Sequence, residues 1–122
     1  MKLKLKQIWA SQQAMPKLLN REIDNVKASF FIARNARVLD VEFDALNLKR
    51  IELVKRMGVE DPANKQWSIP NDKMEEFNKK FEDLLDREVE IPIEPIAISW
   101  LAGCKLSPMD CASIDFMLYD EE

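Results

Sequence analysis

The longest regular pattern of apolar positions in the chain lies between residues 25 and 58. Apolar side chains recur there every three or four residues, at Ile32, Ala36, Leu39, Phe43, Leu46, Leu53 and Met57. This spacing is typical of an amphipathic helix, and further apolar residues widen the stripe enough to suggest burial on more than one side. Asp24 or Asn25 can cap its start, and Gly58 can end it in the left-handed conformation. The sequence therefore predicts one long helix as the spine of the fold.

The N-terminal segment predicts a short strand followed by helix. Residues 2–6 alternate lysine and leucine, which is the period of a half-buried strand, although a frayed helix entry gives the same short pattern. Residues 8–20 then have helical spacing. Pro16 lies within them and predicts either a kink or the start of a second short helix.

Two further helices are predicted in the second half. Residues 71–86 carry apolar side chains at helical spacing, with Asn71 or Asp72 as the N-cap. The last helix begins at Ser107, where the serine caps and a proline occupies the first helical position. Asp110 stands where the glutamate of a capping box would be.

The segments between these helices have the period of strands. Residues 88–98 alternate apolar and other side chains, but Pro92 and Pro95 restrict them to an edge strand or a bent one. For residues 66–69 the sequence predicts either a short strand or a loop that docks Trp67. Together with the N-terminal strand, these segments predict a small antiparallel sheet on which three or four helices pack, one of them long. The predicted fold is α+β, with residues 1–122 as a single domain.

The residue types that the sequence lacks narrow its chemistry. The 122 residues include no histidine, two glycines and two cysteines. Without histidine, the Ser-His-Asp and Cys-His arrangements and the commonest transition-metal ligand are ruled out. Gly58 and Gly103 are too isolated to build a phosphate-binding loop, and Cys104 and Cys111 lack the second pair of a zinc site. Carboxylates are abundant, but no spacing singles out a pair for acid–base catalysis. We therefore expect no enzyme activity, no cofactor and no bound metal.

The charge is unevenly distributed along the chain. Residues 1–58 carry 12 Lys and Arg against 6 Asp and Glu, and residues 59–122 carry 6 against 16, which together give the net charge of −4. One interpretation is that the two halves attract each other in the fold, and the other is an acidic surface that meets a basic partner. The basic residues are scattered among acidic ones, so no nucleic-acid partner is expected. No stretch has the ~18 apolar residues of a membrane span, so no membrane partner is expected either.

Aromatic residues are the strongest candidates for contact with a partner protein. Tryptophans most often fill a core, but Trp67 lies among polar residues, which makes it the best candidate of the three for an exposed anchor. Phe30, Phe31 and Ile32 are successive and bulky, so they cannot all face one core, and self-association into a homo-oligomer would cover them. The candidate partner-binding residues are Phe30, Phe31 and Trp67, with Glu75 and Glu76 from the acidic half.

Four segments, spread over most of the chain, resemble a known family. They are KLKLKQIW at residues 2–9, KLLN at 17–20, EVEIPIEPI at 88–96 and KLSPMD at 105–110. Their order and character are similar to those of a family of short uncharacterised proteins encoded by tailed phages. The resemblance implies a viral origin, expression in a bacterial cytoplasm and a role by contact with another protein. It carries over no catalytic residue.

These observations favour a non-enzymatic phage protein that acts by protein–protein contact. The partner would be a phage structural protein or a host protein, in virion assembly or in a minor structural or accessory role, in the host cytoplasm or the virion. The alternative is an inhibitor of a host enzyme or defence system that uses an acidic face.

Three surfaces would distinguish these hypotheses. Convergence of the acidic residues of 72–94 and 110–122 on one face would favour the inhibitor. One exposed apolar patch of Phe30, Phe31 and Trp67 would favour assembly. A deep pocket lined by several carboxylates would indicate an enzyme.

Overall fold

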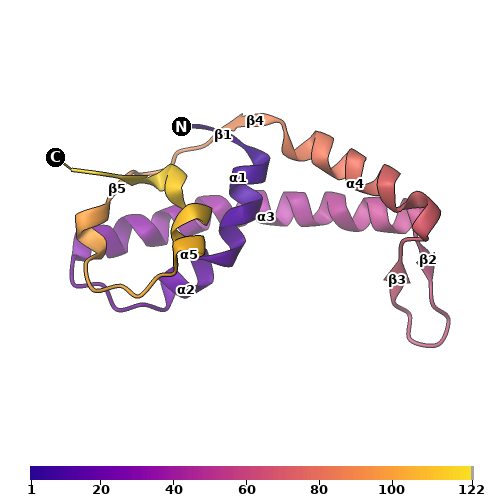
Figure 1. Cartoon of the computed structure of the whole chain (residues 1–122), viewed down its shortest axis with the longest axis horizontal. Helices are drawn as coiled ribbons and strands as arrows, with labels where there is room; N and C mark the ends of the chain where they lie inside the picture. The colour runs from indigo at the N-terminus through magenta and orange to yellow at the C-terminus, as the bar shows by residue number, and fades with distance from the viewer. Residues whose placement is uncertain (122) are drawn as a thin grey trace.

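A single long helix, α3 (Val26–Met57), organises the molecule, which a computed structural model describes for residues 1–121 (Figure 1). Its 32 residues correspond to about 48 Å at the usual rise per residue. The Asn25 side chain accepts a hydrogen bond from a backbone N–H of the first turn at 3.0 Å, and Lys55 and Arg56 lie in the last turn, where the helix dipole favours cations. The predicted spine is confirmed, with Asn25 as its cap.

The hydrophobic core lies along the N-terminal half of α3. Four short elements pack across it: β1 (Lys2–Lys4), α1 (Leu5–Ala10), the 3-10 helix η1 (Ser11–Gln13) and α2 (Met15–Leu19). Pro16 falls in the first turn of α2, where its missing N–H costs nothing. Of the two predicted outcomes for this proline, the start of a second short helix is the one observed. The largest fully buried apolar side chains of the core are Ile8, Leu18, Leu39, Ile96, Ile114 and Met117.

Within residues 1–121 the strands form three separate two-stranded sheets. β1 pairs antiparallel with β4 (Glu88–Glu90), as expected for the N-terminal strand. β2 (Val59–Glu60) and β3 (Trp67–Ser68) form an antiparallel hairpin, and β5 (Ile96–Ala97) pairs parallel with β6 (Leu118–Tyr119). The α+β class is confirmed, but the expectation that residues 66–69 join the N-terminal strand in one sheet is wrong. Their nearest strand partner in the chain is β2, which a short loop brings alongside them.

A buried polar side chain holds the segment between β4 and β5. Pro92 and Pro95 interrupt this segment, so it cannot continue a strand ladder. Asn35 of α3 is fully buried and takes the place of a neighbouring strand. Its amide nitrogen donates to the Glu94 carbonyl at 2.9 Å, and its amide oxygen accepts from the Glu94 N–H at 2.8 Å. Both backbone groups of one residue are thereby satisfied by one side chain.

The C-terminal half of α3 forms an arm with α4 (Asn71–Leu85), which runs back along it towards the core (Figure 1). No residue of α4 is buried. The Trp9 and Phe81 rings meet edge to face at 5.3 Å and 81°, joining α4 to α1. The N-cap of α4 is Pro70, which makes no side-chain bond; the expected capping by Asn71 or Asp72 is therefore wrong.

The β2–β3 hairpin projects from the tip of this arm (Figure 1). Gly58 joins it to α3 in an extended conformation, with φ −94° and ψ 176°, so the predicted left-handed ending is wrong. The glycine is needed for a different reason. A Cβ at this position would collide with the Val54 carbonyl oxygen and would lie 2.8 Å from that of Ser68.

The last part of the chain folds back onto the core through short helices. The 3-10 helix η2 (Ile98–Leu101) follows β5, and α5 (Pro108–Ser113) and the 3-10 helix η3 (Asp115–Met117) lead into β6. Ser107 and Asp110 form the predicted capping box, with bonds of 3.1 and 3.2 Å. The Lys17 ammonium also binds the Asp110 carboxylate, at 3.1 Å. That bond, with those from Ser107, holds the pKa of Asp110 below its usual range.

Candidate interaction surface

Four aromatic rings from three parts of the chain form a continuous series at one end of the molecule, which we call the aromatic end. Phe30 and Phe31 lie on α3, with ring centroids 6.1 Å apart. Phe31 lies 6.4 Å from Trp100 of η2, and Trp100 meets Tyr119 of β6 edge to face at 6.2 Å. These separations lie in the range where aromatic pairs add about 0.5–1.5 kcal/mol each beyond their area burial.

Local geometry explains why part of this series remains exposed. Successive residues on a helix point about 100° apart, so Phe30 and Phe31 cannot both face the core. Phe31 is half-buried against the core, whereas Phe30 remains 58% exposed. Val26, one turn before Phe30 on the same helix face, is also exposed. The β5–β6 pairing places Tyr119 beside Ala97, and Trp100 follows within a few residues.

Two cations lie over these rings. The Lys27 ammonium is 5.6 Å from the Phe31 ring centroid and 5.3 Å from that of Trp100. The Arg34 guanidinium lies 5.7 Å from the centroid of Phe30. A cation over an aromatic face is worth about 0.5–1 kcal/mol at an exposed site. The aromatic end therefore combines apolar rings with two cations, and Glu121, which accepts a hydrogen bond from Ser99 of η2 at 3.3 Å, adds a negative charge beside them.

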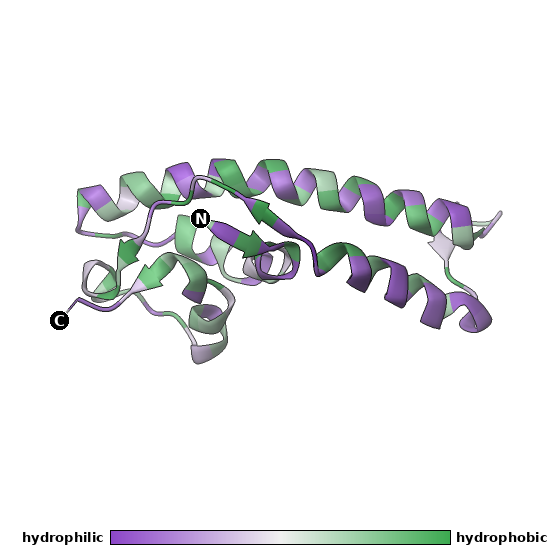
Figure 2. Cartoon of the chain, turned by 90° about the horizontal axis from the view of Figure 1, so that it is seen from above, coloured by the Kyte–Doolittle hydropathy of each residue, from purple (hydrophilic) through white to green (hydrophobic). Residues whose placement is uncertain are grey.

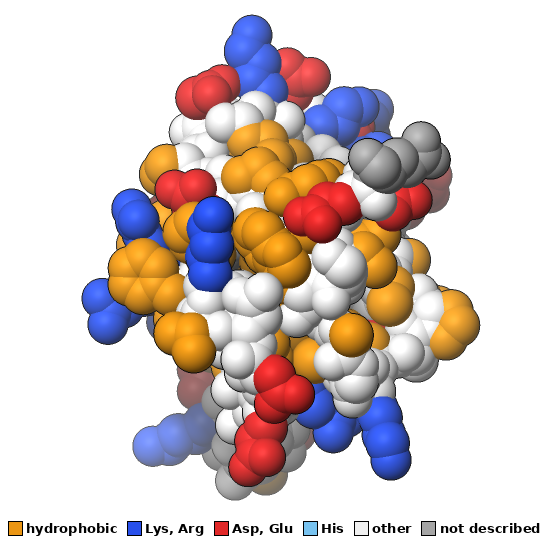
Figure 3. Space-filling view, turned by 90° about the vertical axis from the view of Figure 1, so that its left-hand side faces the viewer, with side chains coloured by type: hydrophobic (Ala, Val, Ile, Leu, Met, Phe, Trp, Pro, Cys, Tyr) orange, Lys and Arg blue, Asp and Glu red, His pale blue; other side chains and the backbone are white. Residues whose placement is uncertain are grey.

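Viewed end-on, hydrophobic side chains gather in the middle of this end of the molecule, with both Lys or Arg and Asp or Glu side chains beside them (Figure 3). Ile98 of η2 is a further exposed apolar side chain that precedes Trp100. Exposed aromatic and aliphatic side chains with a polar rim are the usual composition of a protein-binding patch.

The structure separates the partner-binding residues that the sequence suggests. Phe30 and Phe31 belong to the aromatic end, but Trp67 lies on the hairpin, beyond the other end of α3. The section of α3 from Phe30 to its last residue, Met57, spans about 40 Å at the usual helical rise. Glu75 and Glu76 lie exposed on α4, and Glu76 pairs with Lys80 at 3.3 Å. The single patch of Phe30, Phe31 and Trp67 that would favour assembly is therefore not formed.

The acidic residues of the second half do not converge on one face either. Those of α4 are interspersed with Lys73, Lys79 and Lys80, and Figure 1 places α4 and the C-terminal strand at different ends of the molecule. Asp110 is buried against Lys17, and Glu122 lies outside the described residues. Nothing in this arrangement supports an acidic face made from 72–94 and 110–122.

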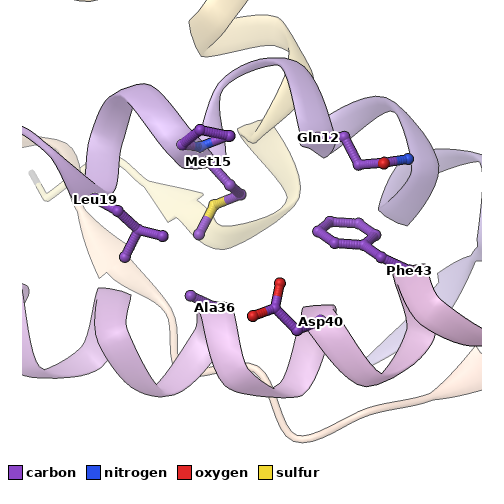
Figure 4. A pocket seen from close by; sticks show the side chains of 7 residues that line it. Gln12, Met15, Leu19, Ala36, Asp40 and Phe43 are labelled. Carbon is purple, nitrogen blue, oxygen red and sulfur yellow. The ribbon is translucent and has the colours of Figure 1, made fainter.

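A groove between α2 and α3 has a volume of about 210 Å³ and is lined mainly by apolar side chains (Figure 4). Met15 and Leu19 line one side, and Ala36 and Phe43 the other, with Asp40 as its one carboxylate. This groove is smaller than ordinary small-molecule sites of about 300–1,000 Å³. It does not bring together the pair of carboxylates that acid–base chemistry uses.

Two further structural observations concern the part of the chain up to residue 121. No group of three or more Cys, Asp or Glu side chains there is arranged to hold a metal ion. None of the helices in that part is both long and apolar enough to cross a membrane.

Comparison with known proteins does not identify a relative. No known protein family, characterised protein or solved structure matches the chain. The function must therefore be argued from the surfaces themselves.

The sequence did not indicate two residues of the aromatic end, Trp100 and Tyr119. Each lies in a short segment whose position depends on the parallel β5–β6 pairing, which joins residues about twenty positions apart and leaves no periodic signal. Phe30 and Phe31 were predictable because adjacent bulky residues on one helix must leave one side chain outside the core.

Proposed function

We propose that this protein acts by binding another protein through the aromatic end and has no catalytic role. The observation that carries the proposal is the series of four rings in which Phe30 is more than half exposed. Burying large apolar side chains contributes about 25 cal/mol per Å², and aromatic residues are enriched among those that dominate binding energy. The cations of Lys27 and Arg34 favour a partner whose contact surface is apolar with acidic residues at its edge.

The nature of the partner follows from the resemblance described above. On that basis we propose a phage structural protein, bound in virion assembly or in an accessory role, or a host protein. The proposed setting is correspondingly the host cytoplasm or the virion. Neither the acidic face of an inhibitor nor the joint patch of Phe30, Phe31 and Trp67 is formed among residues 1–121, so the proposal depends on the aromatic end alone.

Differential capture tests this proposal. The purified protein, its Phe30→Ser variant and a Val59→Ser variant are each used as bait in lysate of phage-infected bacterial cells. Val59 on the hairpin is a matched control, because it is 59% exposed against 58% for Phe30 and lies at the other end of the molecule. We expect a protein that the wild type and Val59→Ser retain and Phe30→Ser loses.

Capture that is equal for all three baits would argue against the aromatic end as the binding surface. Loss with Val59→Ser alone would assign binding to the hairpin. Circular dichroism of each variant checks that the fold is unchanged, as expected for substitution of exposed side chains.

A further inference from the structure

The outer face of α3 carries a regular row of residues that no other helix covers. The row, which we call the α3 outer row, consists of Arg37, Val41, Asp44, Leu48, Ile51 and Lys55, and its spacing alternates between four and three. This is the spacing of the seam positions of a coiled coil. Figure 2 shows α3 along one edge of the molecule, with the other helices on its opposite side. Val41 and Leu48 are each 67% exposed.

The row lies opposite the face that α3 presents to the core. Leu39 and Leu46 are buried on the inner face, and the positions of Val41 and Leu48 are about 200° away around the helix at 100° per residue. Core packing therefore does not account for the aliphatic residues of the outer row.

A shallow hollow flanks the row in the middle of the helix. It is lined by Ala45, Leu48, Lys49 and Glu52, which are spaced i, i+3, i+4 and i+7. At 100° per residue, three of these four residues lie to one side of the row. The hollow is therefore at the edge of the face that a helix packed along the row would cover.

The charges of the row indicate which helix fits it. Arg37 and Lys55 are positive and Asp44, between them, is negative, so the row does not match a uniformly charged surface such as a nucleic acid. A parallel second copy would place each charge against the same charge, which is unfavourable. An antiparallel second copy, in the register that sets Leu48 against Ile51, places Asp44 of each copy against Lys55 of the other.

We infer that the α3 outer row binds a second copy of this chain in antiparallel orientation. The two-fold axis passes between the positions of Leu48 and Ile51, so two aliphatic layers form the centre and an Asp44–Lys55 pair closes each side. Such an interface is isologous, with the same residues contributed by both copies. Opposite charges at its edges fix the register and oppose the alternatives.

The size of this contact sets its strength. In this register the paired section runs from Asp44 to Lys55, roughly 16 Å of helix, and its aliphatic side chains are Leu48 and Ile51 from each copy. The surface area that so short a section buries is well below the ~800 Å² per partner of a standard stable interface. We therefore expect a reversible dimer with a micromolar dissociation constant. Phe30 lies outside the paired section, so the two aromatic ends remain free and point in opposite directions.

Sedimentation velocity of the full chain over a range of concentrations, with charge reversals, tests this inference. Asp44→Lys and Lys55→Asp each replace both edge pairs by like charges and should weaken dimerisation about tenfold or more. The double variant, with both substitutions, restores opposite charges in the antiparallel register and should return the dissociation constant to within about threefold of wild type. Met109→Ser is the control, since Met109 of α5 is 67% exposed and belongs to neither the row nor the aromatic end, so the dimer should be unchanged. Phe30→Ser tests separately whether the aromatic end self-associates.

Several results would overturn the inference. A wild-type chain that remains monomeric up to millimolar concentration would exclude it. Single reversals without effect, or a double variant as weak as either single one, would exclude this register. A tighter dimer for Asp44→Asn would indicate a parallel arrangement, in which Asp44 faces itself. A dimer abolished by Phe30→Ser would assign self-association to the aromatic end. The last result would also bear on the proposed function, whereas the others leave it untouched.

Discussion

Replacing Asn35 by leucine tests how strongly one side chain holds the segment between β4 and β5. Leucine has the same number and branching of side-chain heavy atoms, so the substitution removes the two hydrogen bonds to Glu94, at 2.9 and 2.8 Å, and its bulkier methyl groups add a smaller packing cost. Each bond contributes about 1 kcal/mol net. Leaving the Glu94 N–H and carbonyl without partners adds a desolvation cost, reduced because Glu94 itself is only partly buried. We expect a loss of about 2–3 kcal/mol in the free energy of unfolding.

Urea unfolding followed by circular dichroism measures this loss, and thermal unfolding gives a second estimate. For a chain of this length, 2–3 kcal/mol corresponds to a decrease in Tm of roughly 8–15 °C. Asn47→Leu is the matched control, because Asn47 lies exposed on the same helix and bonds only to Arg50. We expect it to change stability by no more than about 0.5 kcal/mol. If Asn35→Leu loses less than about 1 kcal/mol, the two bonds do not contribute as argued here.

Two further substitutions test the capping box and the hairpin junction. Lys17 is the largest cause of the lowered pKa of Asp110, so this carboxylate stabilises the fold above its unfolded pKa of about 3.9, and the contribution is lost as pH falls through the lower folded value. We therefore expect Asp110→Asn to lower the free energy of unfolding at pH 7 and to make its decline below about pH 4 less steep. Urea titrations at a series of pH values measure both effects. Asp115→Asn is the control and should produce neither effect. Gly58→Ala should lose about 1–3 kcal/mol in urea unfolding, because its Cβ would lie 2.8 Å from the Ser68 carbonyl oxygen.

Each of these substitutions has a result that contradicts its reasoning. Equal acid dependence for wild type and Asp110→Asn would show that the pair with Lys17 does not couple protonation to folding. A Gly58→Ala variant as stable as wild type would show that the junction opens without cost.

Much of the fold could be predicted from local patterns. The boundaries of α3 and α4 followed from helical spacing, and the Ser107 capping box from residue types at fixed offsets. Both signals depend only on residues within a few positions of one another. They were reliable because the forces behind them, capping and amphipathic burial, act at that range.

The remaining features depend on contacts between distant segments. Residues 96–97 pair with 118–119 in a parallel bridge that no turn residue signals. Asn35 lies within a stripe of apolar residues, where the sequence gives no sign that its amide would satisfy the backbone of Glu94. The predicted conformation of Gly58 was wrong. A glycine is needed there because another strand approaches closely, and not because the backbone has a positive φ.

The same contacts explain why the candidate site was only half predictable. Phe30 and Phe31 were found because they are neighbours on one helix. Trp100 and Tyr119 lie beside them because the pairing of β5 with β6 brings these distant segments together. Trp67, the best candidate among the tryptophans for an exposed anchor, is exposed, but its distance from Phe30 is set by the length of α3.

The absence of any buried residue in α4 has a thermodynamic consequence for the whole molecule. The fully buried side chains lie in the core and on α3, whereas α4 contributes only half-buried ones such as Phe81, Leu84 and Leu85. Local unfolding costs least where few apolar contacts must be broken. We therefore expect α4 to detach from α3 at a lower free energy than that of global unfolding, so that a single free energy of unfolding overstates how well α4 is protected.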